Sequence, residues 1–237
     1  MLRIEHLTKE YGDNQLIDDL SLHIMPGEIY GLIGHNGSGK TTTLKCCCGI
    51  KQVRSGEIYV DGISMQKKPL PCKAQIAYIP ANPDLYVFMT GIRFLNFVAD
   101  VYDVSTTDRQ TRIEYYANLF ELTDVLPQSI SVYSAGTRKK LLIIAALIHD
   151  PKLLIMDEPF LSLDPKAVHL LNAEMRALCA RGGSVFLSTH VLEVAERLCD
   201  KVAIMRNGKL LQAGIVNEIK GDSSLMSVFL ELEETYA

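Results

Sequence analysis

The most informative stretch of this chain is Gly34-His35-Asn36-Gly37-Ser38-Gly39-Lys40-Thr41, which fits the phosphate-binding pattern G-x-x-x-x-G-K-[ST]. An apolar run from Ile29 to Ile33 precedes it, and helical periodicity runs from Lys40 to Gly49. Glycines in such a loop let backbone N–H groups turn toward phosphate oxygens, and the helix N-terminus adds the positive end of its dipole. The flanking strand and helix disfavour the alternative, a glycine-rich turn with an incidental lysine. The stretch therefore predicts a nucleotide phosphate site.

Positions within this loop have separate predicted roles. Lys40 would bring a full positive charge to the β- and γ-phosphates, and the Thr41 hydroxyl would bind Mg²⁺. His35 and Ser38 occupy variable positions of the pattern, so their side chains have no predicted role. The residues that we expect to line the nucleotide are Gly34, Asn36, Gly37, Ser38, Gly39, Lys40, Thr41 and Thr42.

A second apolar run, from Leu153 to Met156, ends in two carboxylates, Asp157 and Glu158. The carboxyl edge of a parallel sheet is where such folds bind nucleotides, so both acids are expected beside the phosphate loop. Successive side chains of a strand point in opposite directions, so the two acids need not share a role. We expect Asp157 to reach the Mg²⁺ shell and Glu158 to orient or deprotonate the water that attacks the γ-phosphate. The alternative, a buried strand that simply meets solvent, is disfavoured by the phosphate loop upstream.

Strand and helix signals along the chain predict an α/β fold with a mostly parallel sheet. Apolar residues recur at helical spacing between residues 83 and 150, and Asn207-Gly208 predicts a closing hairpin. We therefore expect one domain over residues 1–237, with core segments 1–82 and 151–237 and a helical subdomain at 83–150. The predicted strands are Leu2 to Leu7, Leu16 to Ile24, Glu28 to Ile33, Glu57 to Val60, Gln75 to Ile79, Leu153 to Met156, Val185 to Leu187, Val202 to Met205 and Lys209 to Gln212.

Composition narrows the class of protein. The 237 residues are 48% hydrophobic and 22% charged with a formal net charge of -4, which is typical of a globular domain and argues against a free-standing nucleic-acid binder. No window of about 18 residues is apolar and uncharged, so we expect no membrane-spanning helix, and the first five residues do not start a secretory signal. The six cysteines include no C-x-x-C pair, so we expect buried reduced thiols.

Together these residues resemble the nucleotide-binding domain of ATP-binding cassette (ABC) transporters, and the resemblance runs nearly end to end. Residues 133–137, Tyr-Ser-Ala-Gly-Thr, are similar to the signature loop of that family. Ser162-Leu163-Asp164 is similar to its dimer-contact loop, and His190 occupies the place of its switch histidine. Tyr11 matches the aromatic residue that stacks on adenine, and Met226-Ser227-Val228-Phe229-Leu230-Glu231-Leu232 resembles the tail of ABC-2-type exporter ATPases.

The resemblance implies a P-loop NTPase core of the RecA-like type, with an N-terminal antiparallel β subdomain and a helical insert. It implies an ATPase that uses ATP and Mg²⁺, with Lys40, Glu158 and His190 as catalytic residues and Thr41 and Asp157 as metal ligands. The function implied is to power a membrane transporter, most naturally an exporter. A separate transmembrane permease would bind near residues 83–93, which places the chain on the cytoplasmic face of the cell membrane.

The resemblance also implies two ATPase subunits packed head to tail, either identical or different. Ser134 and the Gly136 backbone of one subunit would then contact the γ-phosphate held by the other, and Asp164 would lie at the same contact. Ser134 also suits a helix N-cap, which is compatible with an anion site, and the helix is expected to begin near Arg138.

Two positions depart from the family pattern. The signature loop has Tyr-Ser-Ala-Gly-Thr where the commonest family form is Leu-Ser-Gly-Gly-Gln. Ala81 stands where relatives usually have a glutamine or glutamate that touches Mg²⁺ or the attacking water. We hypothesise that Asn82 takes over that contact.

Two alternative functions stay open. A regulatory module that binds ATP with little turnover is favoured by Ala81 and the altered signature, and opposed by Glu158 and His190. A soluble ABC ATPase in DNA repair, chromosome organisation or translation is opposed by the single cassette and by the lack of a long coiled coil. The sequence does not identify the transported substrate.

Overall fold

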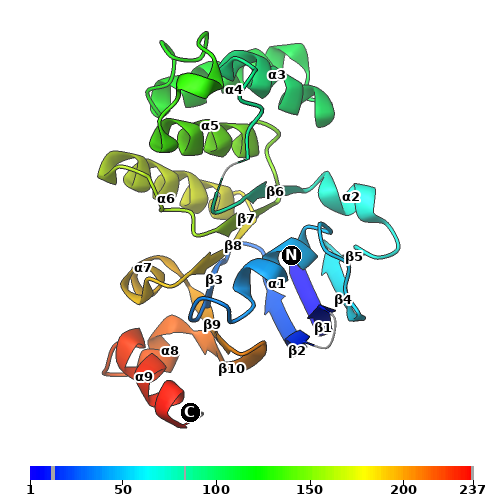
Figure 1. Ribbon diagram of the computed structural model, residues 1–237, viewed down its shortest axis with the longest axis vertical. Helices are drawn as coiled ribbons and strands as arrows, with labels where there is room; N and C mark the ends of the chain where they lie inside the picture. Colours follow the sequence, from blue (N-terminus) through cyan, green and yellow to red (C-terminus); the bar gives the residue numbers. More distant parts are fainter. Residues whose placement is uncertain (12–13, 83, 236–237) are drawn as a thin grey trace.

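The computed structural model describes residues 1–11, 14–82 and 84–235 and contains two sheets (Figure 1). The first is antiparallel and has the order β2-β1-β4-β5, with bounds Asn14–Ile24, Leu2–Tyr11, Ser55–Val60 and Ile63–Ser64. The second has the order β10-β9-β3-β8-β7-β6, with bounds Lys209–Ile215, Lys201–Arg206, Ile29–Ile33, Ser184–Thr189, Leu153–Asp157 and Ile76–Ile79.

The second sheet is parallel from β9 to β6, and only the β9–β10 pair is antiparallel. Every residue of β3, β7 and β8 is buried, as expected for central strands covered on both faces. The predicted α/β class, the parallel sheet, the antiparallel N-terminal sheet and the closing hairpin are therefore confirmed. Several strands extend beyond the predicted bounds; β1 runs to Tyr11 and β8 to Thr189.

Helices cover both faces of the parallel sheet. α1 (Lys40–Cys47) packs between it and the antiparallel sheet, where Cys46 and Cys47 are buried among apolar side chains. The other face is covered by α6 (Pro165–Ala180), α7 (Leu192–Leu198) and the helices of residues 84–150. The helices of residues 84–150 are α3 (Gly91–Val101), α4 (Thr106–Leu119), η1 (Ile130–Val132) and α5 (Ala135–Leu147). The other described helices are α2 (Pro69–Lys73), α8 (Val216–Lys220) and α9 (Leu225–Thr235).

Helices α3–α5 lie at one end of the long axis of the molecule, and α8 and α9 lie at the other (Figure 1).

α5 begins at Ala135, directly after Ser134, so the expected start near Arg138 is wrong. The Ser134 hydroxyl accepts from the Thr137 N–H, and this cap satisfies a donor that a later start would have left unpaired. No helix in the described part of the chain is long and apolar enough to cross a membrane.

Strand register brings the predicted site residues to one edge of the parallel sheet. Ile33, the last residue of β3, pairs with Thr189 at the end of β8, and Asp157 at the end of β7 pairs with Ser188. The phosphate loop, the two acids and His190 follow these three neighbouring strands. This edge is where open α/β sheets hold their ligands.

Candidate active site

The phosphate loop is shaped by close approaches of its backbone to neighbouring chain. A Cβ atom at Gly34 would lie 2.2 Å from the Met205 carbonyl oxygen, and one at Gly39 would lie 2.8 Å from that of Leu16. Gly39 also has a φ of 108°, which a side chain disfavours. A Cβ at Gly37 would meet no atom within 4 Å, so the loop is open on that side. The two close approaches therefore explain why glycine is required at positions 34 and 39.

Lys40 is buried at the start of α1 and reaches back over the loop. Its Nζ donates to the Gly34 carbonyl at 2.6 Å and to the His35 carbonyl at 2.9 Å. Burial lowers the pKa of Lys40, and the nearby carboxylates of Glu158 and Asp157 oppose that shift. The ammonium is thus held between the loop and two negative charges, which is suitable for binding an anion there.

Asp157 is joined to the phosphate loop by direct hydrogen bonds. The Thr41 hydroxyl donates to Asp157 Oδ2 at 2.8 Å, and the Ser188 hydroxyl donates to Oδ1 at 2.5 Å. Both carboxylate oxygens are therefore fixed, and Asp157 is only 3% exposed. Hydroxyl and carboxylate oxygens are the donors that Mg²⁺ prefers. Among the described residues no group of three or more His, Cys, Asp or Glu side chains converges, but Mg²⁺ bound with substrate phosphates needs only one or two carboxylates.

Glu158 lies just beyond β7 in a different orientation. Its φ is 46°, a left-handed value that is uncommon for a residue with a side chain. Its N–H donates to the Ser188 hydroxyl at 3.2 Å, and its Oε1 lies 2.8 Å from His190 Nδ1. Because a carboxylate only accepts hydrogen bonds, the imidazole donates. Asp157 and Glu158 therefore have separate partners, as the strand geometry predicts.

A cavity of about 300 Å³ lies over the phosphate loop. The Ser38 hydroxyl, within this loop, is buried away from the cavity and has no hydrogen-bond partner among the described residues. Lys40 and the open face at Gly37 both line the cavity and fit a phosphate group. The residues that line the cavity are Leu16, Asn36, Gly37, Gly39, Lys40, Thr41, Thr42, Ala81 and Glu158.

A model of the ABC transporter family matches residues 17–161, which is more than half of the chain and includes both the phosphate loop and the two acids. This chain belongs to the ABC transporter family. It is 33% identical over 237 residues to the ABC-type transporter ATP-binding protein EcsA of Bacillus subtilis, covering 98% of this chain and 96% of that one. It is 32% identical to the Nod factor export ATP-binding protein I of Paraburkholderia xenovorans, covering 90% of this chain and 70% of that one.

The fold is shared with a solved ATP-binding subunit of an ABC transporter. That structure superposes with a TM-score of 0.94 at 34% sequence identity and covers 98% of this chain and 99% of its own. The ABC ATPase family and the P-loop NTPase fold are therefore confirmed, and the relatives support ATP binding.

The signature loop of this ABC ATPase lies apart from the cavity over its own phosphate loop. Ser134 is exposed at the N-terminus of α5, and no residue between 133 and 137 lines that cavity. A Cβ at Gly136 would lie 2.8 Å from the Ser162 carbonyl oxygen, so the signature loop and the loop after β7 pack closely there. Asp164 caps α6 through the Ala167 N–H and pairs with Lys140. These residues do not meet the phosphate loop of their own subunit.

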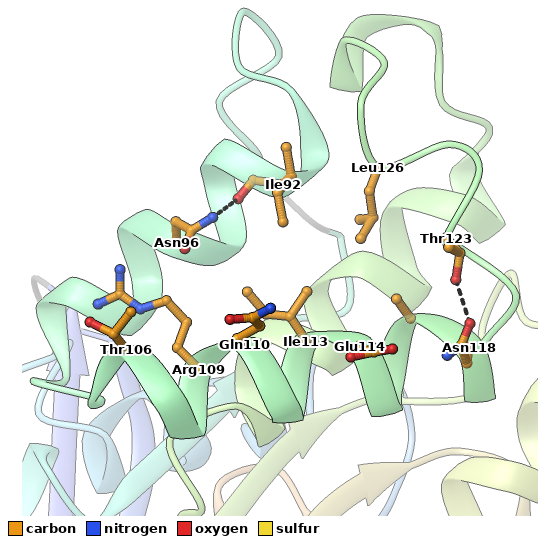
Figure 2. Close-up of a pocket in the computed structure, with 11 residues that line it drawn as sticks. Ile92, Asn96, Thr106, Arg109, Gln110, Ile113, Glu114, Asn118, Thr123 and Leu126 are labelled. Atoms are coloured by element: carbon orange, nitrogen blue, oxygen red, sulfur yellow. Dashed lines mark hydrogen bonds between the residues drawn. The ribbon is translucent and has the colours of Figure 1, made fainter.

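A second cavity of the ABC ATPase lies between α3 and α4, and its volume is about 520 Å³ (Figure 2). Ile92, Ile113 and Leu126 line it, and the side chains of Asn96 and Thr123 are both hydrogen-bonded within the protein. No phosphate-loop or acidic-strand residue lines it, so it is not the nucleotide site.

The contacts of three residues at or near the site were not predicted from the sequence. Ser188 bonds to both acids, but the strand pairing that places it there is tertiary. Lys139 is buried although it is flanked by basic residues, which usually indicates a solvated helix face. His35 pairs with Glu233 of α9 at 3.3 Å and contacts the Phe229 ring edge-on, so the phosphate loop touches the C-terminal helix. The local signals for these residues were the short polar run at the end of β8 and the resemblance of the tail.

Tyr11, His149 and the six cysteines were also given predicted roles or surroundings. The side chain of Tyr11 lies outside the described residues, although its backbone ends β1, so its predicted contact with adenine stays a prediction. His149 stacks on Tyr102 with ring centroids 3.6 Å apart and contacts the Ile76 carbonyl, as a structural histidine does. All six cysteines are buried and free, as predicted.

Proposed function

We propose that this ABC ATPase subunit hydrolyses ATP to power a membrane exporter, acting from the cytoplasmic face of the membrane. The observation that carries the proposal is the convergence of Lys40, Asp157 and Glu158 at one edge of the parallel sheet. The export assignment is supported by the similarity to Nod factor export ATP-binding proteins and by the resemblance of the C-terminal tail. These similarities do not identify the transported substrate.

The phosphate loop binds the triphosphate through its backbone N–H groups and through Lys40. Thr41 and Asp157 are the proposed Mg²⁺ ligands, because their oxygens lie 2.8 Å apart and Thr41 lines the phosphate cavity. When bound, Mg²⁺ neutralises charge that develops on the phosphate oxygens. Ser188 keeps the Asp157 carboxylate in place by donating to its second oxygen.

Glu158 is the proposed general base for the attacking water. It lines the cavity together with Lys40, and it is oriented by its hydrogen bond to His190. Because that bond fixes the imidazole, His190 can donate toward the γ-phosphate with its other nitrogen when protonated. The two residues therefore act as one unit on the same phosphate.

A second subunit completes the site in this proposal. Ser134, Gly136 and Asp164 would contact nucleotide held by the partner, since they lie apart from the cavity of their own subunit and Ser134 is exposed. The first turn of α5 has free N–H groups that favour an anion. The partner is a second copy of this chain or a different ABC ATPase, and no nucleic acid takes part.

The permease is proposed to bind at an exposed apolar patch that we call the aromatic patch, formed by Tyr86, Val87, Phe88, Phe97 and Val101. The ring of Tyr86 contacts the rings of both Phe88 and Phe97, and Phe88 is 78% exposed. Apolar patches of this kind on a globular domain mark interaction sites. The aromatic patch overlaps the predicted contact region at residues 83–93, and α3 supplies the rest of it.

Mixing two defective variants tests the head-to-tail arrangement of identical subunits. Lys40→Ala damages the phosphate loop and Ser134→Arg damages the signature loop, so each is inactive alone. A mixed dimer has one site made of two intact halves, and random exchange should restore about a quarter of the wild-type sites. The measurement is phosphate release after mixing the variants.

The matched control mixes Lys40→Ala with Glu158→Gln. Both changes lie in the same half of the site, so every mixed dimer has two damaged sites and no activity should return. Equal recovery in both mixtures, or recovery in neither, contradicts the proposed dimer of identical subunits.

The regulatory alternative with little turnover is favoured by one observation, that Ala81 lines the cavity in place of a polar side chain. A steady-state ATPase assay on the purified chain, alone and with its permease, decides between the two functions. Magnesium-dependent turnover supports the transport ATPase, and tight ATP binding without turnover supports the regulatory module.

A further inference from the structure

A lysine is buried behind the wall of the phosphate cavity. Lys139 lies on α5 and is 1% exposed, and its Nζ donates to the Pro80 carbonyl at 2.9 Å and to the Ala81 carbonyl at 3.4 Å. An ammonium in such a place costs free energy unless its N–H groups and its charge find partners. A methionine of similar length would fill the same space without that cost, so packing alone does not require the charge.

The charge of Lys139 faces the catalytic edge of the sheet. Its electrostatic partners are Asp157 and Glu158, which follow β7, and its hydrogen-bond acceptors are the two carbonyls that follow β6. Burial lowers the pKa of Lys139 to about 8, and the two carboxylates oppose that shift. Ala81, whose carbonyl accepts from Lys139, lines the cavity together with Lys40 and Glu158. Lys139 therefore binds the backbone of the segment that lines the phosphate cavity at Ala81.

The same helix also carries the signature loop. Ser134 caps α5, and Lys139 follows it by five positions, which corresponds to about 7.5 Å along a helix axis. α5 packs against β6, whose end carries Pro80 and Ala81. A movement of the first turns of α5 would therefore be transmitted to the carbonyl of Ala81 through a short, rigid connection.

We propose that Lys139 is a positioning residue for ATP hydrolysis, which ties the signature helix to the cavity wall at Pro80 and Ala81 and so couples the signature loop of a subunit to its own phosphate site. This inference rests on the proposed function, in which Ser134 and Gly136 contact nucleotide bound by the partner. The alanine side chain at position 81 offers no polar contact of its own, so the link runs through its backbone.

The test replaces Lys139 with methionine, which keeps the length and removes the charge and the donors. We expect Lys139→Met to fold, to bind ATP within about threefold of wild type, and to lose at least about tenfold in kcat, because small displacements at a reacting centre have effects of that size. Lys139→Arg retains charge and donors and should recover part of the rate. Lys152→Met, at an exposed lysine paired with Asp61, is the matched control and should behave as wild type.

The pH dependence of kcat separates positioning from a purely structural role. Wild-type kcat should fall as the pH rises through about 8, because Lys139 then loses its proton. Lys40 faces the same two carboxylates and also has a lowered pKa, so it contributes its own loss at alkaline pH. Comparing wild type with Lys139→Met isolates the part due to Lys139, which should be absent in the variant.

Each outcome bears on the inference. Unchanged kcat in Lys139→Met, or loss of folding and ATP binding in parallel with kcat in both Lys139 variants, overturns it. If Lys139→Met does not fold, the comparison of Lys139→Arg with wild type decides the matter, because arginine keeps its charge and the part of the alkaline loss due to Lys139 should be absent in that variant. If the wild type has no magnesium-dependent turnover, the proposed function itself fails. If the wild type turns over ATP, the mixed variants recover activity and Lys139→Met has a normal kcat, only the coupling through Lys139 is rejected.

Discussion

The phosphate loop and the signature loop both present the N-terminus of a helix, but their hydrogen-bond partners lie in different places. Lys40 and Thr41 of the phosphate loop bond to their own loop and to Asp157 across the sheet. Among the described residues, Ser134 of the signature loop bonds to Thr137 and Arg138 at the start of α5, and Ser134 is exposed. One chain therefore contains a phosphate loop that is tied to its own sheet edge, and a signature loop that is exposed at the start of α5.

The difference indicates how a single fold makes ATP hydrolysis depend on assembly. Binding residues sit on the rigid sheet edge, where strand pairing fixes them. Ser134 and Gly136, which would complete the transition-state charge in the proposed dimer, lie at the N-terminus of α5 and do not line the cavity at that edge. Because electrostatic stabilisation is usually the largest catalytic contribution, the proposed sharing of its donors between two subunits predicts that an isolated chain is slow.

Glu158→Gln should have the largest effect on turnover while sparing ATP binding. The amide cannot accept the water proton, and removal of a general base lowers rates by about 10²–10⁴-fold. The backbone N–H bond of residue 158 to Ser188 is unaffected, so the loop should keep its shape. The measurement is steady-state phosphate release together with calorimetric ATP binding.

Asp157 and Glu158 can be distinguished by a companion variant. Asp157→Asn removes a proposed metal ligand, so it should weaken magnesium-dependent nucleotide binding, which Glu158→Gln should not. Near-normal turnover in Glu158→Gln would show that Glu158 is not the general base. The phosphate-loop side of the site would then lack the catalytic residue that the comparison of the two loops gives it.

Gly34→Ala and Gly136→Ala compare the two loops by adding the same single carbon. At Gly34 the new Cβ would lie 2.2 Å from a backbone oxygen, so the phosphate loop must shift, and we expect a loss of about 1–3 kcal/mol in stability with weaker ATP binding. At Gly136 the Cβ would lie 2.8 Å from the Ser162 carbonyl, beyond the phosphate loop. ATP affinity of the single chain should then stay within about twofold, while kcat of the assembled pair falls about tenfold.

Calorimetric titration of both variants, followed by kcat at saturating ATP, checks this pair. A parallel loss of affinity in Gly136→Ala would show that the signature loop contributes to the site of its own subunit.

Much of the phosphate half-site could be predicted because its signals are local. The glycine pattern, the apolar run before it and the run ending at Asp157 are contiguous in sequence, and their strands follow from composition. Ser188 could not be assigned, since its bond to Asp157 depends on the β7–β8 register. Lys139 next to Lys140 predicts a solvated face, and only packing against the end of β6 buries it. The helix start at Ala135 was mispredicted because Gly136 lowers helix propensity, although the serine cap was a valid signal.

Acid should loosen the far end of the signature helix. Burial lowers the pKa of His149, just beyond α5, to about 4, and nearby Arg112 acts in the same direction. The unfolded chain takes up this proton near pH 6.5, so below that pH the unfolded state binds more protons and the free energy of unfolding falls until about pH 4. Between pH 6.5 and 5 we expect a loss of about 2 kcal/mol from this residue.

Urea unfolding at several pH values measures that loss, and His149→Gln should flatten the dependence. Hydrogen exchange should show faster opening at the C-terminal end of α5 at pH 5 than at pH 7, with the phosphate loop little changed. An equal pH slope in the variant would assign the acid sensitivity to other groups.

Asn82→Ala should have the smallest effect. The hypothesis that Asn82 replaces the missing polar side chain requires it to face the cavity, but Ala81 lines the cavity and Asn82 is exposed and does not. A change in kcat of less than about twofold is therefore expected, as for most exposed substitutions. A tenfold loss would restore Asn82 to the mechanism and weaken the case for Lys139, because the two would then offer competing routes from the helical layer to the attacking water. Measuring Asn82→Ala beside Lys139→Met under the same conditions separates those routes.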